Sequence, residues 1–395
     1  MNEHRSGSTK ALDNQYIMHT YGRYDVVLTR GKGVTAYDED GKAYLDVSSG
    51  IGVNSLGYCD EGWVAAVTKQ AATMQHMSNY FFSPQASVLA EKLCTLTGMA
   101  KVCFGNSGAE ANECAIKIAR KYSFDKYGAD RNEIITLRDS FHGRTVTTLS
   151  ATGQDVFHNF FFPFTEGFSH VTAGDMQCLE EAVSDKTCAV MLELIQGEGG
   201  VNILDKGYVR ALFEFCAARD ILVIVDEVQT GVGRTGRLFA FEHYGVQPDL
   251  VTAAKGLGGG LPIGVCLCSE KLAGVMTPST HGTTFGANPV VCAGANYVLE
   301  TVANEAFLNA VEERGAYLEK LLRALPAVKN VRRMGLMVGI EVDGDAHDIA
   351  VKCVENGLLI ITAKNLLRML PPLTITREEL ANAVSILKST LKECP

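Results

Sequence analysis

One apolar run constrains the fold of this chain more than any other feature. Residues 221–225 are all aliphatic and rich in β-branched side chains, and the run ends abruptly in the acidic pair Asp226 and Glu227. This pattern is typical of a strand that is buried on both faces of a parallel sheet. Open α/β sheets bind ligands at the carboxyl ends of such strands. We therefore expect Asp226 to lie at a ligand site on the edge of a sheet.

A lysine follows a second strand-like segment. Residues 250–254 are apolar or small and lead directly to Lys255, which enters a glycine-rich loop at residues 256–260. Apolar surroundings lower the pKa of an amine and leave its nitrogen nucleophilic. Pyridoxal phosphate requires an acidic partner for its pyridinium nitrogen and a lysine for its aldehyde. Asp226 and Lys255 therefore predict a pyridoxal-phosphate site.

The composition narrows the class of protein. A chain of 395 residues exceeds what one hydrophobic core usually serves, so we expect two lobes. A formal net charge of −9 argues against nucleic acid or an anionic membrane as a partner, although local arginines can still bind small acidic substrates. The N-terminus lacks the apolar stretch of a signal peptide, and no segment has membrane-spanning length. We expect a cytoplasmic protein.

The cysteine pattern does not indicate a disulfide framework. The twelve cysteines are spread singly, apart from the pair Cys266 and Cys268. Small buried apolar side chains in a reducing cytosol explain this pattern better. Cys266 and Cys268 would face one side of a strand, and we expect no metal site.

The order of segments predicts an α/β fold with a mostly parallel central sheet, helices on both faces and a smaller α+β domain. Residues 1–14 are polar and expected to be frayed, and residues 26–46 contain short strands joined by turns, the first at 26–28. From residue 62 onward, helix-length and strand-length segments alternate, which is typical of parallel sheets. The expected central elements are strands 101–104, 133–137, 189–194 and 221–225 and a long helix at 109–127.

This order also predicts the division into domains. We expect residues 1–60 to join the small domain, residues 61–290 to form the large cofactor-binding domain, and residues 291–395 to form the C-terminal small domain.

A turn of small residues is a candidate phosphate site. Ser107, Gly108 and Ala109 lie where the strand at 101–104 passes into a helix. Small residues let an anion approach free backbone N–H groups, and the helix dipole favours negative charge. An ordinary capped turn would look the same, so this motif alone leaves both interpretations open.

An aromatic residue and two arginines are candidates for contacts with the cofactor ring and the substrate. Phe141 follows a predicted strand and can stack on a pyridine, and Arg144 can bind a carboxylate through two N–H groups. Arg368 is embedded in an apolar run. A buried arginine requires a carboxylate, either from a substrate or from Glu198. Taken singly, Phe141 could be a core residue and Arg144 a surface residue.

Three further features are ambiguous. Gln229 follows Asp226 by three residues and could reach the phenolic oxygen of the cofactor, whereas His142 could equally be a packing residue. The glycines at 256–260 lack the spacing of a dinucleotide loop, so a nucleotide cofactor is only weakly indicated.

Together these motifs resemble the class III pyridoxal-phosphate-dependent aminotransferases. The resemblance extends from about Tyr24 to the C-terminus. It rests on residues 106–112, 141–145, 196–198, 226–231, 254–264 and 281–286. It implies fold type I of pyridoxal-phosphate enzymes and a homodimer whose active sites lie at the subunit interface.

The resemblance also implies roles for individual residues. Lys255 would bond to the cofactor aldehyde, and Asp226 would hold the pyridinium nitrogen. Ser107, Gly108 and Ala109 would bind the cofactor phosphate, and Thr284 would reach the phosphate of the cofactor bound in the partner chain. Phe141 would stack on the ring, and Gln229 would contact the phenolic oxygen. The substrate would be bound by Arg144, Glu198 and Arg368.

The implied reaction moves the δ-amino group of N2-acetyl-L-ornithine to 2-oxoglutarate and yields glutamate. Glutamate brings two carboxylates, one for Arg144 and one for Arg368, whereas acetylornithine would leave Arg368 unpaired. We hypothesise that Glu198 then neutralises Arg368. Gly50 stands where ornithine-specific members usually have a tyrosine, which leaves room for an acyl group.

Other functions stay open at this point. Ornithine, succinylornithine, 4-aminobutyrate or a lysine-pathway substrate would use the same machinery. A nicotinamide-dependent dehydrogenase or a catalytically silent binding protein would belong to another class and would lack the covalent cofactor.

Overall fold

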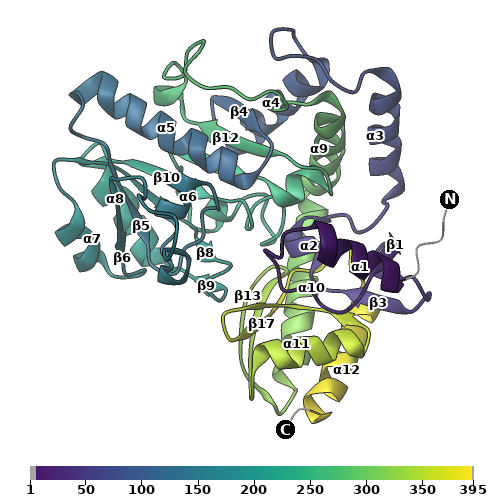
Figure 1. The fold of residues 1–395 in the computed structure, drawn as a ribbon. Helices are drawn as coiled ribbons and strands as arrows, with labels where there is room; N and C mark the ends of the chain where they lie inside the picture. Colours follow the sequence, from purple (N-terminus) through teal and green to yellow (C-terminus); the bar gives the residue numbers. More distant parts are fainter. Residues whose placement is uncertain (1–5, 394–395) are drawn as a thin grey trace.

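A seven-stranded sheet forms the centre of the molecule in the computed structural model, which describes residues 6–393 (Figure 1). The strands, in order across the sheet, are β4 (Lys101–Gly105), β12 (Gly264–Cys268), β11 (Leu250–Ala253), β10 (Leu222–Asp226), β7 (Thr187–Leu192), β5 (Glu133–Leu137) and β6 (Phe168–Val171). Neighbours from β11 to β6 are parallel, and β12 runs antiparallel to both β11 and β4. The predicted α/β fold with a mostly parallel central sheet is confirmed.

Alternate residues of the central strands pack on opposite faces of this sheet. In β10, Ile224 belongs to an apolar cluster with α5 (Gly108–Tyr127), whereas Val223 and Val225 belong to a second cluster with α8 (Lys206–Ala217). All three side chains are buried. The strand is therefore covered on both faces, as its unbroken apolar run predicts.

Further helices complete the layers around the large sheet (Figure 1). Contacts join α4 to β4 and α9, α3 to α9, α6 to α5 and β5, and α7 to β6 and α8. Their bounds are α3 Glu61–Thr73, α4 Pro84–Thr97, α6 Val146–Ala151, α7 Met176–Ala182 and α9 Pro289–Val302.

A four-stranded antiparallel sheet near the C-terminus has its own helical layer. Its strands, in order, are β13 (Val328–Met334), β14 (Met337–Val342), β17 (Leu366–Met369) and β16 (Ile361–Ala363). The helices that pack beside it are α10 (Glu305–Arg323), α11 (Ala346–Glu355) and α12 (Arg377–Glu393). The predicted smaller α+β unit is therefore present.

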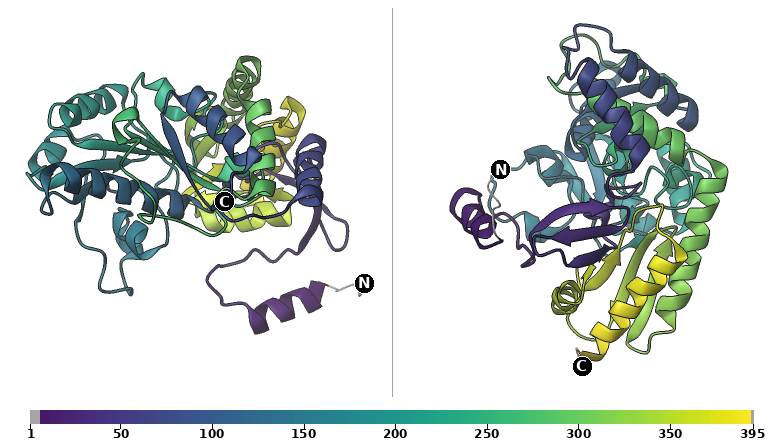
Figure 2. Two further views of the ribbon diagram at one scale, coloured as in Figure 1. Left: turned by 90° about the horizontal axis from the view of Figure 1, so that it is seen from above. Right: turned by 90° about the vertical axis from the view of Figure 1, so that its right-hand side faces the viewer.

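The N-terminal strands share a sheet with the C-terminal part of the chain. This sheet has the order β1 (Leu28–Lys32), β2 (Thr35–Asp38), β3 (Ala43–Asp46) and β15 (Leu358–Leu359). β15 runs parallel to β3, and Figure 2 shows the purple N-terminal strands beside the yellow C-terminal elements. The domain boundaries at residues 60 and 290 stay a prediction.

Two expectations for the N-terminal region are wrong. Residues 6–14, expected to be frayed, belong to α1 (Ser6–Tyr16), while residues 1–5 lie outside the described part. Polar contacts tie α1 to later residues, including Lys10 Nζ to Asp25 Oδ1 at 2.6 Å. The first strand begins at Leu28 instead of residue 26, because pairing with β2 sets its start. Neither contact can be inferred from local periodicity.

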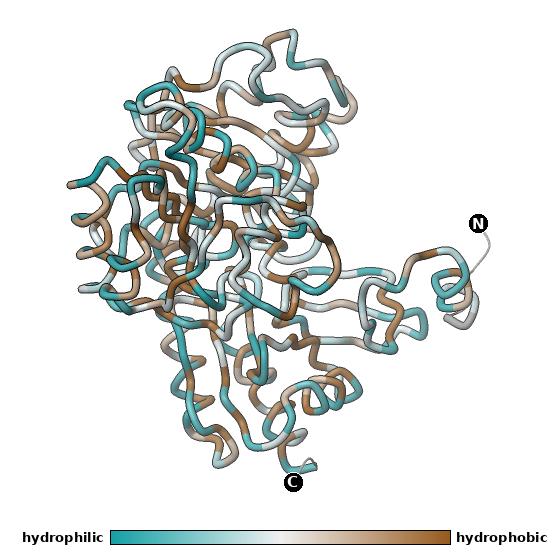
Figure 3. Tube along the Cα trace, turned by 60° about the vertical axis from the view of Figure 1, so that its left-hand side comes forward, coloured by the Kyte–Doolittle hydropathy of each residue, from teal (hydrophilic) through white to brown (hydrophobic). Residues whose placement is uncertain are grey.

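The apolar segments concentrate inside the sheets and beneath the packed helices (Figure 3). Among residues 6–393, no helix combines the length and the apolar character that crossing a membrane requires.

Candidate active site

The carboxyl ends of four parallel strands meet at one cavity of about 480 Å³. Asp226 ends β10, Lys255 follows β11, Phe141 follows β5 and Glu193 follows β7. Nine of the predicted site residues line this cavity: Ser107, Gly108, Ala109, Phe141, Arg144, Glu198, Asp226, Gln229 and Lys255.

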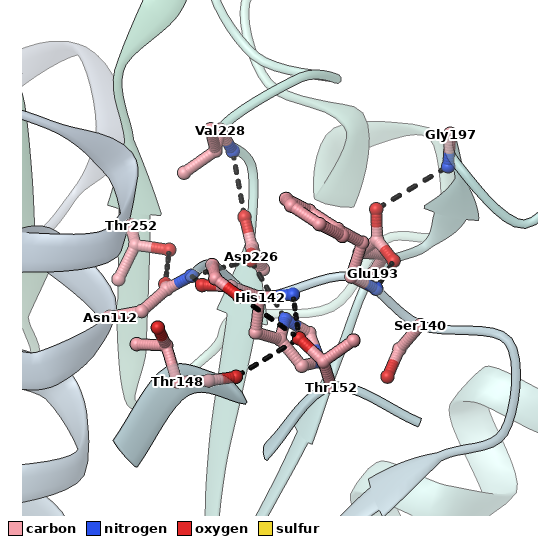
Figure 4. Close-up of polar contacts among 12 residues, drawn as sticks. Asn112, Ser140, His142, Thr148, Thr152, Glu193, Gly197, Asp226, Val228 and Thr252 are labelled. Carbon is pink, nitrogen blue, oxygen red and sulfur yellow. Dashed lines mark hydrogen bonds and ion pairs between the residues drawn. The ribbon is translucent and has the colours of Figure 1, made fainter. Parts of the chain in front are cut away.

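Three donors hold the carboxylate of Asp226 (Figure 4). Oδ2 accepts a hydrogen bond from Asn112 Nδ2 at 2.8 Å and lies 2.8 Å from His142 Nδ1. Oδ1 accepts from the backbone N–H of Val228 at 3.0 Å. These three hydrogen bonds fix the orientation of the carboxylate. Because a carboxylate offers about four lone-pair positions, one position remains for a further N–H group.

His142 and Asn112 are functional candidates that the sequence analysis did not assign to the site. Thr252 donates to Asn112 Oδ1 at 2.7 Å, and this bond orients the amide so that Nδ2 faces Asp226. His142 Nε2 is buried and has no hydrogen-bond partner among residues 6–393. The available signals were a polar residue one turn after Gly108 and a histidine beside Phe141. Neither distinguishes a site residue from a packing residue.

Lys255 adopts a strained backbone conformation. It begins the short helix η3 (Lys255–Gly258) with φ of +41°, in the left-handed region that non-glycine residues rarely occupy. Strain of this kind costs on the order of 1–3 kcal/mol and clusters at functional sites. Burial lowers the pKa of the Lys255 amine, and the charge of Glu198 offsets this only in part. More of the amine is therefore neutral and nucleophilic at a given pH.

The N-terminus of α5 forms another wall of the cavity. Ser107 caps this 20-residue helix, with Oγ accepting from the N–H of Glu110 at 3.2 Å. A Cβ atom on Gly108 would lie 2.7 Å from Val228 Cγ1, so glycine allows α5 to approach the loop that follows Asp226. Free N–H groups and the positive end of the dipole make this wall suitable for a phosphate.

Arg144 lines the cavity from an exposed position. Its guanidinium lies 3.9 Å from the centroid of the Phe157 ring and 5.5 Å from that of Phe141. These aromatic contacts hold a cation beside the ring predicted to stack on the cofactor.

Glu193 is a second buried carboxyl group in the site. Burial raises its pKa well above the usual range, and the negative charge of Asp226 adds to this rise. Its oxygens accept from the N–H groups of Phe141 at 2.9 Å and Gly197 at 3.3 Å. Glu193 therefore joins these two backbone segments, and its raised pKa favours the uncharged form beside Asp226.

Arg368 lies on the small C-terminal sheet and contacts two residues that line the cavity, Glu198 and Gln229. It lies on β17 with 2% of its side chain exposed, and Nη1 and Nη2 contact Glu198 Oε1 and Oε2 at 2.7 and 3.1 Å. Nη1 also donates to Gln229 Oε1 at 3.2 Å. Burial alone would raise the pKa of Glu198, but the charge and hydrogen bond of Arg368, together with Lys255 and Gln229, hold this pKa below its usual value.

The turn that holds Glu198 depends on glycine. It connects β8 (Ile195–Gln196) to β9 (Asn202–Ile203). A Cβ atom on Gly197 would lie 2.1 Å from Gln229 Oε1, so any larger residue would displace Gln229 from Arg368.

Two predicted site residues, Arg368 and Thr284, are not among those that line this cavity. Arg368 contacts Glu198, which does line it. Thr284 is the other, and it is exposed. Its predicted role belongs to a partner chain, and that role stays a prediction.

The residues fit pyridoxal phosphate. The open acceptor position on Asp226 suits a pyridinium N–H, and the N-terminus of α5 suits a phosphate. Lys255, with its lowered pKa, supplies the amine for an aldehyde. Phe141 lines the same cavity and supplies an aromatic face.

Comparison with known proteins agrees with this fit. The family model described as aminotransferase class-III matches residues 16–391. The chain is 49% identical to the acetylornithine aminotransferase of Haemophilus ducreyi over 98% of this chain and 99% of that protein.

Solved structures are also similar. The ornithine aminotransferase of Toxoplasma gondii, whose active site shows partial occupancy of PLP, superposes with a TM-score of 0.94 at 34% identity, covering 99% of this chain and 95% of that chain. The acetylornithine aminotransferase of Elizabethkingia anophelis gives 0.86 at 33% identity, covering 98% of this chain and 99% of that chain.

Proposed function

Because the chain belongs to the class III aminotransferases, a pyridoxal-phosphate-dependent family, we propose that it transfers the δ-amino group of N2-acetyl-L-ornithine to 2-oxoglutarate. The products are N-acetyl-L-glutamate 5-semialdehyde and L-glutamate, and the reaction belongs to arginine biosynthesis. The observation that supports this substrate pair most directly is the ion pair between Glu198 and Arg368 beside Lys255.

The ion pair addresses a problem that two different substrates create. L-Glutamate has a carboxylate next to its reacting carbon, and Arg368 binds it once Glu198 moves away. Acetylornithine presents an apolar stem there, so Arg368 would remain as a buried, unpaired cation, which is costly. Glu198 neutralises Arg368 in that half-reaction, and Arg144 binds the remote carboxylate of either substrate.

The remaining residues bind and orient the cofactor. Pyridoxal phosphate, when bound, supplies an aldehyde that condenses with amines and a pyridinium ring that withdraws electrons. Asp226, oriented by Asn112, His142 and the N–H of Val228, would accept a hydrogen bond from the ring nitrogen and stabilise its positive charge. Phe141 would supply an aromatic face to the ring.

Residues that line the cavity also account for contacts with the phosphate and the phenolic oxygen of the cofactor. Ser107, Gly108 and Ala109 line the cavity and would hold the phosphate. Gln229, whose bond to Glu198 is long at 3.4 Å, would bind the phenolic oxygen.

Lys255 is the catalytic base and acid. Its Nζ would hold the cofactor through the aldehyde, and the freed amine would take a proton from the reacting carbon of the substrate and later give it back. The lowered pKa of this amine suits it to accept and release a proton.

The space around Gly50 supports an acylated substrate. An added Cβ atom there would have Asn54 Nδ2 as its nearest neighbour, at 3.5 Å. Glycine at this position removes the side chain that ornithine-specific members usually carry there.

We also propose a cytoplasmic homodimer with active sites at the subunit interface. Thr284, exposed outside its own cavity, would bind the phosphate in the partner chain. Three consecutive exposed aromatic side chains, Tyr80, Phe81 and Phe82, are 95%, 70% and 100% exposed and support an apolar interface. Residues 1–60 and 291–395 would form the small domain beside the large domain at 61–290.

A half-reaction screen tests the substrate assignment. The holoenzyme is mixed separately with acetylornithine, succinylornithine, ornithine and 4-aminobutyrate, and loss of the cofactor's visible absorption is followed under single-turnover conditions. Among the four amines, acetylornithine should give the highest single-turnover rate constant at a given substrate concentration. If the enzyme clearly prefers free ornithine or 4-aminobutyrate, the proposed substrate is wrong and the preferred amine takes its place. If succinylornithine reacts as fast as acetylornithine, the enzyme is specific for acylated ornithines in general.

A further inference from the structure

A cluster of two thiols and an imidazole lies outside the cavity described above. One ligand atom from each of Cys103, Cys114 and His281 lies within 4.8 Å of the others. Cys103 lies on β4, Cys114 lies on α5, and His281 lies in the loop after β12. Three separate segments therefore bring metal-binding atoms to one point.

The cluster borders a cavity and includes further potential ligands. A cavity of about 270 Å³ is lined by all three residues together with Glu110 and Glu113. A third thiol, that of Cys266, shares a hydrogen bond with Cys114, and Cys266 is the cross-strand neighbour of Cys103. A thiol, a carboxylate or water can therefore supply a fourth ligand.

The separations suit a tetrahedral ion. Bonds of about 2.3 Å to sulfur and about 2.0 Å to nitrogen place tetrahedral ligand atoms roughly 3.5–3.8 Å apart. Atoms that already lie within 4.8 Å of one another need to move by only about 1 Å to reach this geometry. Thiolate and imidazole donors favour zinc over magnesium or calcium.

Both thiols are protonated in the metal-free protein. The hydrogen bond with Cys114 and burial raise the pKa of Cys103. The bond from Cys103 lowers the pKa of Cys114, but its bond with Cys266 and its burial outweigh this effect, so the net pKa of Cys114 is raised. A bound cation would therefore displace two protons.

Lys117 is the main group that opposes a cation at this point. Its Nζ lies 3.0 Å from His281 Nδ1 and donates to the carbonyl of Thr280 at 2.8 Å. The Lys117 side chain is exposed and can turn toward solvent. Glu110 and Glu113 carry opposite charge beside the same cavity and reduce the remaining repulsion.

We propose that Cys103, Cys114 and His281 form a binding site for a thiophilic divalent cation of the zinc type. On binding, two S–H bonds break, two metal–sulfur bonds form, and two protons pass to solvent. The ion joins β4 and α5 to the loop at 281–283, which already contacts the turn after β4 through Asn106 Nδ2 and Thr283 Oγ1 at 2.9 Å. This site is independent of the proposed substrate.

A titration with Co²⁺ as a spectroscopic probe tests the proposal. The full-length holoenzyme, kept reduced with a phosphine, is titrated with Co²⁺ alone and then with Zn²⁺. We expect one Co²⁺ per chain with thiolate-to-metal charge transfer and intense red-region bands of a tetrahedral site, where pyridoxal phosphate does not absorb. Zn²⁺ should displace it and release about two protons per ion.

Matched variants locate the site. Cys103→Ala and His281→Gln should each weaken Co²⁺ binding at least ~100-fold, because loss of even an outer partner of a metal ligand costs 10–100-fold. Cys178→Ala, at a partly buried cysteine on α7 remote from the cluster, should leave binding unchanged. His281 lies in a loop, so its variant remains informative if removal of a cysteine disturbs folding.

Three outcomes would overturn the site. These are no thiolate band at saturating Co²⁺, a band that survives both Cys103→Ala and His281→Gln, and proton release near zero. None of these results depends on which amine the enzyme uses, so failure here and failure of the proposed function are distinguishable.

Discussion

The guanidinium of Arg368 and the carboxylate of Glu198 form a two-pronged ion pair, with N–O distances of 2.7 and 3.1 Å. Arg368 lies on β17 and Glu198 lies in the turn between β8 and β9, 170 positions apart in the chain. Arg368 is nearly fully buried, whereas 30% of the Glu198 side chain is exposed. Glu198 is therefore the partner that can move away, and Arg368 is the one that must stay neutralised.

Replacing Glu198 by alanine should impair the two half-reactions unequally. Acetylornithine cannot neutralise Arg368, so its single-turnover rate should fall about 100-fold, corresponding to about 3 kcal/mol. The glutamate half-reaction should change by less than about threefold, because the substrate carboxylate replaces Glu198 at the guanidinium. Glu214→Ala, at an exposed position on α8, serves as a control. Equal losses in both half-reactions would contradict this exchange of partners.

Removal of the Lys255 amine should abolish turnover without removing the cofactor pocket. In Lys255→Ala we expect kcat to fall roughly 10⁴-fold or more, because proton transfer at the substrate carbon loses its base. Asp226 and the N-terminus of α5 remain, so pyridoxal phosphate should still bind, as measured by equilibrium dialysis. A variant with a near-normal rate would show that another residue serves as the base.

The contact between His142 and Asp226 should be functional as well as structural. His142→Ala removes one hydrogen-bond partner from the Asp226 carboxylate, a loss that corresponds to roughly 10- to 100-fold in kcat. His142→Asn places an amide N–H near the position of Nδ1 and should restore much of the rate. The absorption spectrum of the bound cofactor reports protonation of its ring nitrogen. It should change in the alanine variant and be largely restored in the asparagine variant. Equal activity in the alanine variant and the unsubstituted enzyme would limit His142 to packing.

Glu227 should make the stability of the protein depend on pH. Burial raises its pKa from 4.5 to about 7, despite hydrogen bonds from Thr230 and the N–H of Phe241. Between these two values the folded state keeps a proton that the unfolded state releases, so the free energy of unfolding falls as pH rises, by roughly 3 kcal/mol in total.

Thermal denaturation of Glu227→Gln measures this effect. The amide variant does not titrate, so its melting temperature relative to that of the unsubstituted protein should rise between pH 5 and pH 8. A constant difference across this range would show that Glu227 does not change protonation on unfolding.

Local sequence patterns determined much of the fold. The aliphatic run before Asp226 predicted a strand covered on both faces, and β10 is such a strand because alternate side chains must point to opposite sides. The predicted strand at 133–137 and helix at 109–127 agree with β5 and α5 to within one residue. Because parallel strands place their carboxyl ends on one edge, the proximity of Asp226, Lys255 and Phe141 also followed.

Only the tertiary structure decided which distant side chains meet. The donors Asn112 and His142 on Asp226 and the convergence of Cys103, Cys114 and His281 join residues from separate elements. For Arg368 the sequence left two partners open, a substrate or Glu198, and the structure shows the pair with Glu198. Such contacts depend on how sheets and helices pack across the interior, because hydrogen bonds and ligand geometry require atoms within a few ångströms. Periodicity along the chain specifies which face a residue occupies, but it does not specify which residue lies opposite.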